Sequence, residues 1–175
     1  MLRSLVGSEM CIRDSYFRSA PSDVVQGAAL ADLMIGDGAL TAAFIVMNDS
    51  YGTGLFEYTS APYTDAGGEI VYEVIYDPQA ENFDAEVSAA VEADPDAIVI
   101  IGFDETSKIL TGLIEAGAGP ADKMLYGSDG NMGNALAQAF DDPGVVAGMR
   151  GTVPGVDIEV NEEFIARLLS LIHIS

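Results

Sequence analysis

Continuous apolar runs rich in β-branched and aromatic residues recur along the chain and predict five β-strands. These runs cover residues 41–47, 69–75, 97–101, 123–127 and 145–153. The first and third are almost entirely apolar, so we expect both of their faces to be buried, as in the central strands of a parallel sheet.

Between these runs, apolar residues spaced three and four apart predict helices. The first helix runs from a cap at Ser22 to the glycine-rich residues 36–38, and a weaker one spans 51–65, where Pro62 removes a hydrogen bond. Two more apolar stripes are formed by Phe83, Val87, Ala90 and Val91 and by Ile109, Leu110, Leu113 and Ile114. Strict alternation of strand and helix predicts right-handed crossovers and an α/β fold, a Rossmann-like parallel sheet with helices on both faces.

The strong negative charge of the chain argues against nucleic acid and anionic lipid as partners. The chain has 7 basic and 28 acidic residues, a net charge of −21, and such a polyanion repels nucleic acid and anionic lipid. Its hydrophobic share of 49% is too high for a disordered acidic tail. No apolar run has the length of a membrane span, so we expect no membrane insertion of this segment.

Both termini carry a signature of DNA processing. A DNA string that encodes residues 10–15, when reversed and complemented, encodes residues 169–174, and it resembles the transposon end used to prepare sequencing libraries. We therefore expect residues 1–15 and 169–175 to be adaptor-derived, with a natural insert at 16–168. The only cysteine, Cys11, and the only histidine, His173, fall in these two segments.

Without Cys11 and His173, little remains for catalysis or metal binding. A general base would have to be a carboxylate, lysine or tyrosine, and no Gly-x-Ser-x-Gly elbow occurs. The glycines after the first strand lack the spacing of the nucleotide-binding motifs. We expect no catalytic residue, no metal site and no cofactor.

Candidate binding residues follow the strands, because parallel sheets bind ligands beyond the carboxyl ends of their strands. The relevant loops cover residues 48–54, 102–105 and 127–130. Asp104 is most simply the N-cap of the next helix. Asp129 is open between two roles, a cap for a helix near 132–140 and a ligand contact. Phe103 and Tyr51, judged alone, are more typical of packing.

The order of several motifs resembles the substrate-binding proteins of branched-chain amino acid ABC transporters. The motifs are Phe17-Arg18-Ser19-Ala20-Pro21-Ser22-Asp23, Gln26-Gly27, Asn48-Asp49-Ser50-Tyr51-Gly52-Thr53-Gly54, Gly67-Gly68-Glu69, Tyr76-Asp77, Asn82-Phe83, Asp94-Pro95-Asp96-Ala97 and Gly127-Ser128-Asp129-Gly130. Their combined order covers residues 16–153 and is more specific than any single motif.

The resemblance implies a type I periplasmic binding fold of two lobes that enclose a ligand. Residues 16–153 would be the second lobe, and 154–168 the start of the crossover back to the first. Asp129 would pair with the ammonium of an amino acid. Phe103, which stands where the family often has tyrosine, would cover the ligand without a hydroxyl, and Tyr51 would lie near the cleft mouth.

The implied function is extracytoplasmic solute binding, with an amino acid or amide as ligand and the membrane permease as partner, and without catalysis. Other functions stay open. The same fold serves in sensors for amides or other small ligands and in receptor domains, and an α/β enzyme using a carboxylate pair is a third reading.

Overall fold

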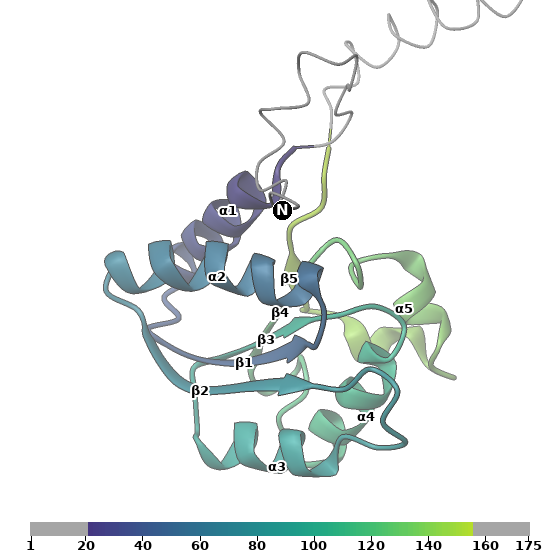
Figure 1. Ribbon diagram of the computed structural model, residues 1–175. Coiled ribbons are helices and arrows are strands. Elements are labelled where there is room, and N and C mark those ends of the chain that lie inside the picture. Colours follow the sequence, from purple (N-terminus) through teal and green to yellow (C-terminus); the bar gives the residue numbers. More distant parts are fainter. Residues whose placement is uncertain (1–20, 156–175) are drawn as a thin grey trace, which may run out of the picture.

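The computed structural model describes residues 21–155 and shows a five-stranded parallel sheet in the order β2-β1-β3-β4-β5 (Figure 1). The strands are β1 (Thr41–Met47), β2 (Glu69–Tyr76), β3 (Ala97–Ile101), β4 (Met124–Gly127) and β5 (Arg150–Gly151). The helices are α1 (Asp23–Gly36), α2 (Ser50–Asp65), α3 (Asp84–Glu92), α4 (Thr106–Glu115), α5 (Asn134–Gln138) and the 3-10 helix η2 (Pro143–Val146).

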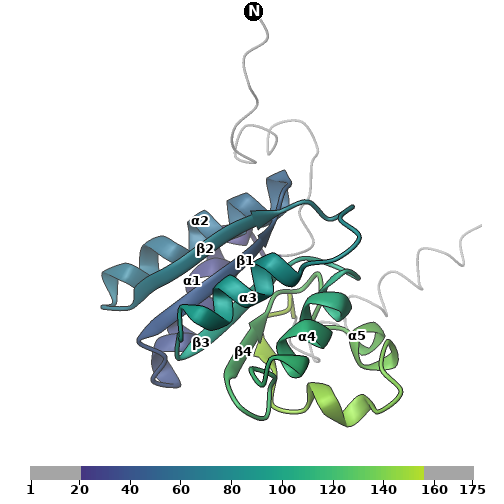
Figure 2. The same ribbon diagram turned by 90° about the horizontal axis from the view of Figure 1, so that it is seen from below.

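Helices cover both faces of the sheet. Helices α1 and α2 lie on one face, and α3 and α4 lie on the other (Figures 1 and 2). Alternate residues of β1 serve the two resulting cores: Phe44 packs on the α1 and α2 side, whereas Ile45 packs on the α3 and α4 side. All side chains of β3 are buried. The predicted fold class, a Rossmann-like α/β sheet with two buried central strands, is therefore confirmed.

Four of the five predicted strands are present within one residue of their expected ends. The prediction for residues 145–153 is largely wrong, because this stretch begins in η2 and contributes only the two-residue strand β5. Asp142 stabilises η2 by accepting a hydrogen bond from Gly144 N at 2.8 Å, and Gly148 turns the chain with a φ of +99°. Val146 and Met149 pack against the α3 and α4 core, so the apolar run reflects burial without a strand.

The predicted helices are present, but their caps differ. Helix α1 starts after Ser22 as expected, although the Ser22 side chain makes no capping hydrogen bond. Asp104 is not an N-cap, because α4 begins at Thr106 with Glu105 before it. Asp129 is not a cap either, since the predicted helix near 132–140 shortens to α5 with Gly133 as its N-cap.

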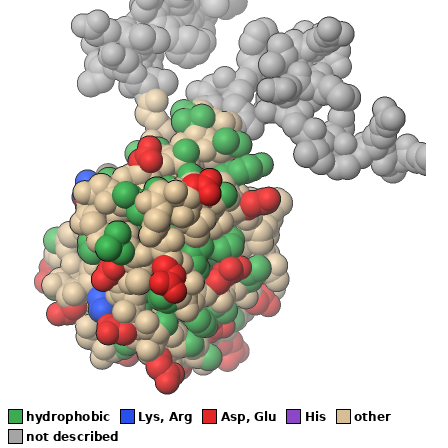
Figure 3. Space-filling view, turned by 90° about the vertical axis from the view of Figure 1, so that its left-hand side faces the viewer, with side chains coloured by type: hydrophobic (Ala, Val, Ile, Leu, Met, Phe, Trp, Pro, Cys, Tyr) green, Lys and Arg blue, Asp and Glu red, His purple; other side chains and the backbone are tan. Residues whose placement is uncertain are grey.

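The surface of the described residues is strongly acidic. Lys108, Lys123 and Arg150 are the only basic residues within 21–155, and Figure 3 shows scattered red side chains with little blue between them. Lys123 pairs with Asp94 and Arg150 with Asp37. Within the same range, no helix is long and apolar enough to cross a membrane.

The predicted adaptor segments lie outside the described residues. The same holds for residues 156–168 of the expected crossover to the first lobe.

Candidate functional site

The three residues predicted to bind ligand come together at the carboxyl edge of the sheet. Tyr51 lies in the first turn of α2, Phe103 in the loop after β3 and Asp129 in the loop after β4. The Tyr51 hydroxyl donates to Asp129 Oδ1 over 2.6 Å. The rings of Tyr51 and Phe103 stack with centroids 5.2 Å apart and planes inclined by 30°. A carboxylate and two aromatic rings thus form one cluster.

Asp49 places Tyr51 at this edge. Its side chain accepts from Gly52 N at 2.6 Å and caps α2, a role that the sequence prediction missed. Gly52 is required there, because a Cβ at that position would collide with the Met47 carbonyl oxygen. The end of β1 and the start of α2 are therefore locked together, which fixes the direction in which Tyr51 projects.

The hydroxyl of Tyr51 is held as a hydrogen-bond donor. It lies 2.9 Å from Ser128 Oγ as well as 2.6 Å from Asp129, and a carboxylate can only accept. The Tyr51 hydroxyl therefore keeps its hydrogen and donates it to Asp129, and the Ser128 hydroxyl is free to donate to the Tyr51 oxygen. Burial and then the bond to Asp129 raise the pKa of Tyr51 well above its ordinary value, so the phenol stays protonated at neutral pH.

Gln26 is a fourth member of the cluster. Its Nε2 donates to Asp129 Oδ1 over 2.7 Å from the beginning of α1. The sequence drew attention to Gln26 only as part of a motif and gave no signal for this contact, which spans 103 positions. Both donors reach Oδ1, and within residues 21–155 no hydrogen bond to Oδ2 is present. Asp129 is exposed, so Oδ2 is available to a ligand.

A buried amide supports the loop that carries Asp129. Asn131 Oδ1 accepts from Ser128 N at 2.9 Å, and Nδ2 donates to Ile100 O at 2.9 Å and to Thr106 Oγ1 at 3.1 Å. One side chain thereby joins β3, α4 and the loop after β4. Because all three hydrogen bonds are buried, their loss would be costly, and Asn131 strongly favours a single loop conformation.

The loop that carries Phe103 has its own support. Glu105 Oε1 accepts from Phe103 N at 3.1 Å and from the Tyr76 hydroxyl at 2.6 Å. Burial and the bond to Glu105 raise the pKa of Tyr76, which therefore remains a donor. Phe103 itself is 44% exposed. An aromatic ring held in place and left open to solvent at this edge is suited to cover an apolar group.

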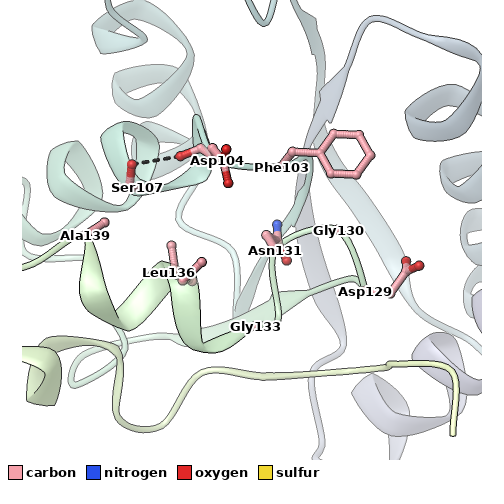
Figure 4. A pocket seen from close by; sticks show the side chains of 10 residues that line it. Phe103, Asp104, Ser107, Asp129, Gly130, Asn131, Gly133, Leu136 and Ala139 are labelled. Atoms are coloured by element: carbon pink, nitrogen blue, oxygen red, sulfur yellow. Dashed lines mark hydrogen bonds between the residues drawn. The ribbon is translucent and has the colours of Figure 1, made fainter.

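A pocket of about 250 Å³ adjoins the cluster. Figure 4 shows it between the start of α4 and α5, with the Phe103 ring and the Asp129 carboxylate directed away from its interior. Its lining includes Asp104, Ser107, Asn131 and Leu136. Across residues 21–155, histidine, cysteine and acidic side chains form no group of three or more that could hold a metal ion.

Comparisons with known proteins identify the family and the fold. The sequence profile of the family described as periplasmic binding protein matches residues 7–169. No curated protein matches the chain.

Solved structures share the fold. A Rhodospirillum rubrum protein named for a branched-chain amino acid ABC transporter matches with a TM-score of 0.72 and 23% identity over 89% of this chain and 44% of its own. A leucine-binding protein from Thermotoga maritima matches with 0.64 and 22% over 72% of this chain and 36% of its own. A Rhodopseudomonas palustris solute-binding protein in complex with 3,4-dihydroxybenzoic acid matches with a TM-score of 0.56 and 18% identity over 65% of this chain and 34% of its own.

The chain spans less than half the length of these structures, which is the extent of one lobe of a type I periplasmic binding fold. Its parallel sheet and the helices on both faces of that sheet match such a lobe. The chain belongs to the periplasmic binding protein family.

Proposed function

We propose that the chain is the second lobe of an extracytoplasmic binding protein that captures an amino acid or a related small ligand between two lobes and delivers it to an ABC permease. The observation that carries the proposal is the Asp129 carboxylate, which is held through Oδ1 and open at Oδ2 beside two stacked rings.

An ammonium group is the ligand feature that fits Asp129 best. A carboxylate enclosed by a closing cleft needs a cationic partner to offset its loss of hydration. A hydrogen bond between charged groups contributes about 1.5–3 kcal/mol. The Phe103 and Tyr51 rings then offer apolar contact to the rest of the ligand, while the carboxylate of an amino acid would have to be bound by the other lobe.

A hydroxylated aromatic acid is a second candidate. It is favoured by the aromatic pair and by the structural neighbour that holds 3,4-dihydroxybenzoic acid. Its phenol could donate to Asp129 Oδ2, but its carboxylate would have to point away from Asp129. The same two-lobed scaffold would also suit a small-ligand sensor, in which case a regulatory partner replaces the permease.

The test is calorimetric titration of a protein containing both lobes with L-leucine and, separately, with 3,4-dihydroxybenzoate. Asp129→Asn preserves the shape and removes the charge, so leucine affinity should fall about 10- to 100-fold. Asp141→Asn, an exposed aspartate on another loop, serves as the matched control and should leave the affinity unchanged.

Unchanged leucine affinity in Asp129→Asn would contradict the ammonium assignment. Tight binding of the dihydroxybenzoate with no leucine binding would favour the second candidate. The 175-residue chain alone should bind leucine negligibly, because contacts from the other lobe are missing.

A further inference from the structure

One amide group connects the binding cluster to the segment by which the chain leaves the lobe. Gln26 Nε2 donates to Asp129 Oδ1 over 2.7 Å and to the backbone carbonyl of Thr152 over 3.3 Å. An amide nitrogen carries two hydrogens, so both bonds can be made at once. We call residues 152–155 the exit segment, since it follows β5; in Figure 1 its yellow trace runs past the beginning of α1.

The helix that carries Gln26 cannot easily adjust its position. The next residue, Gly27, is buried against α2, where an added Cβ would lie 2.6 Å from the Tyr58 carbonyl carbon and 2.7 Å from its oxygen. Helices α1 and α2 therefore touch backbone to backbone at this point. The backbone of Gln26 is therefore fixed, and a change in its hydrogen bonds would be taken up by the side chain and its two partners, Asp129 and the exit segment.

The exit segment has an unmet hydrogen-bonding need. Thr152 Oγ1 is buried and has no hydrogen-bond partner among the residues the structure describes. A buried hydroxyl without a partner is unfavourable, so an arrangement of this segment that supplies a partner would be stabilised. The exit segment thus has one hydrogen bond that depends on Gln26, at the Thr152 carbonyl, and one hydroxyl, Thr152 Oγ1, that would gain a partner if the segment rearranged.

We propose that Gln26 is a positioning residue that couples the Asp129 carboxylate to the exit segment. The coupling deepens the proposed function and rests on it. A ligand cation at Oδ2 would draw negative charge away from Oδ1 and so weaken the hydrogen bond that Oδ1 accepts from Gln26, whose amide is shared with Thr152. In a two-lobed protein, the segments that leave a lobe absorb the motion of closure. Gln26 links occupancy of the site to that motion.

The coupling itself is testable in the ligand-free 175-residue chain by amide NMR. Asp129→Ala removes the acceptor, so the amide resonances of Thr152 and Val153 should shift. In a Gln26→Leu background, the same Asp129→Ala change should no longer shift them. A side chain that only filled space would give equal shifts in both backgrounds. If Gln26→Leu fails to fold, Gln26→Met keeps the length of the side chain and removes its donors.

Tyr51→Phe is the matched control, because it removes the other donor to Oδ1 without touching Thr152. In that background the effect of Asp129→Ala on Thr152 and Val153 should persist. The proposal is overturned if Asp129→Ala leaves these two amides unmoved, or moves them equally with and without Gln26. Because no ligand is used, a failure of leucine binding in the two-lobed protein would count against the proposed function and not against this coupling.

Discussion

Two aspartates at opposite ends of the sheet accept nearly the same set of hydrogen bonds, but the donors differ in origin. Asp96, just before β3, accepts on Oδ2 from Leu40 N at 3.1 Å and from Thr41 N at 2.9 Å. Asp129, just after β4, accepts on Oδ1 from the Tyr51 hydroxyl and from Gln26 Nε2. Each carboxylate thus accepts two hydrogen bonds on one of its oxygens, and both aspartates are exposed.

The origin of the donors separates the two. The donors to Asp96 are backbone groups at the start of β1, and Asp96 N donates in return to Thr41 Oγ1 at 2.8 Å. This reciprocal clamp joins the beginnings of two neighbouring strands, which is a structural role. The donors to Asp129 are side chains from two different helices. Such an arrangement can orient a carboxylate toward a third group, which is what a binding site requires.

The largest expected loss of stability comes from neither aspartate but from the support beneath Asp129. Asn131→Ala removes three buried hydrogen bonds, two of them to backbone groups of Ser128 and Ile100, so the free energy of unfolding should fall by about 3 kcal/mol. Urea denaturation of the chain measures this. Asn134→Ala, on the exposed first residue of α5, should change it by less than about 0.5 kcal/mol. Equal effects of the two substitutions would show that the loop does not depend on the buried amide.

Asp96→Ala should have the next largest effect, a loss of about 1–2 kcal/mol, because two backbone N–H groups lose a charged acceptor. The loss should depend on pH. Hydrogen bonds from Thr41 lower the pKa of Asp96 below its ordinary value of 3.8. A lowered folded-state pKa means that the contribution is fully present above 3.8 and disappears as the pH falls through the lower, folded-state value.

Denaturation curves at pH 7 and at pH 2.5 check this dependence. The wild type and Asp96→Ala should differ at pH 7 and approach each other at pH 2.5. A deficit that is the same at both pH values would mean that Asp96 acts through packing or loop geometry and not through its charge.

The sequence predicted the layers better than the connections between them. The strands at 41–47 and 97–101 were readable because a strand buried on both faces is apolar throughout. The apolar run at 145–153 misled, because Val146 and Met149 are buried from a 3-10 helix and a turn. Local pattern reports burial reliably, but it does not report which backbone conformation achieves that burial.

The site shows the same division. We expected Tyr51, Phe103 and Asp129 near one edge because each follows a strand, and the carboxyl ends of parallel strands meet there. Their assignment as ligand contacts came from the family resemblance and stays a prediction. Gln26 was missed as a contact because it reaches the edge from the beginning of α1, a helix that precedes the first strand of the sheet. Its partners Asp129 and Thr152 are 103 and 126 positions away, and no local rule connects them.

Asp129 should contribute least to stability, and the ionic strength should set the size of its effect. Asp129→Asn keeps an acceptor for Gln26 and Tyr51 but removes one charge from a chain whose net charge is −21. At about 10 mM salt, where charges interact over roughly 30 Å, the variant should be as stable as the wild type or more stable by up to about 0.5 kcal/mol. At about 1 M salt the interaction range falls to roughly 3 Å, and the gain should vanish, because relief of repulsion no longer matters.

The deficit of Asp96→Ala should persist at both salt concentrations, since short hydrogen bonds to the backbone are screened far less. Chemical denaturation with urea, which is uncharged, separates the two cases. If Asp129→Asn costs more than about 1 kcal/mol at both salt concentrations, Asp129 is a structural clamp like Asp96, and its place among the ligand contacts loses its main physical support.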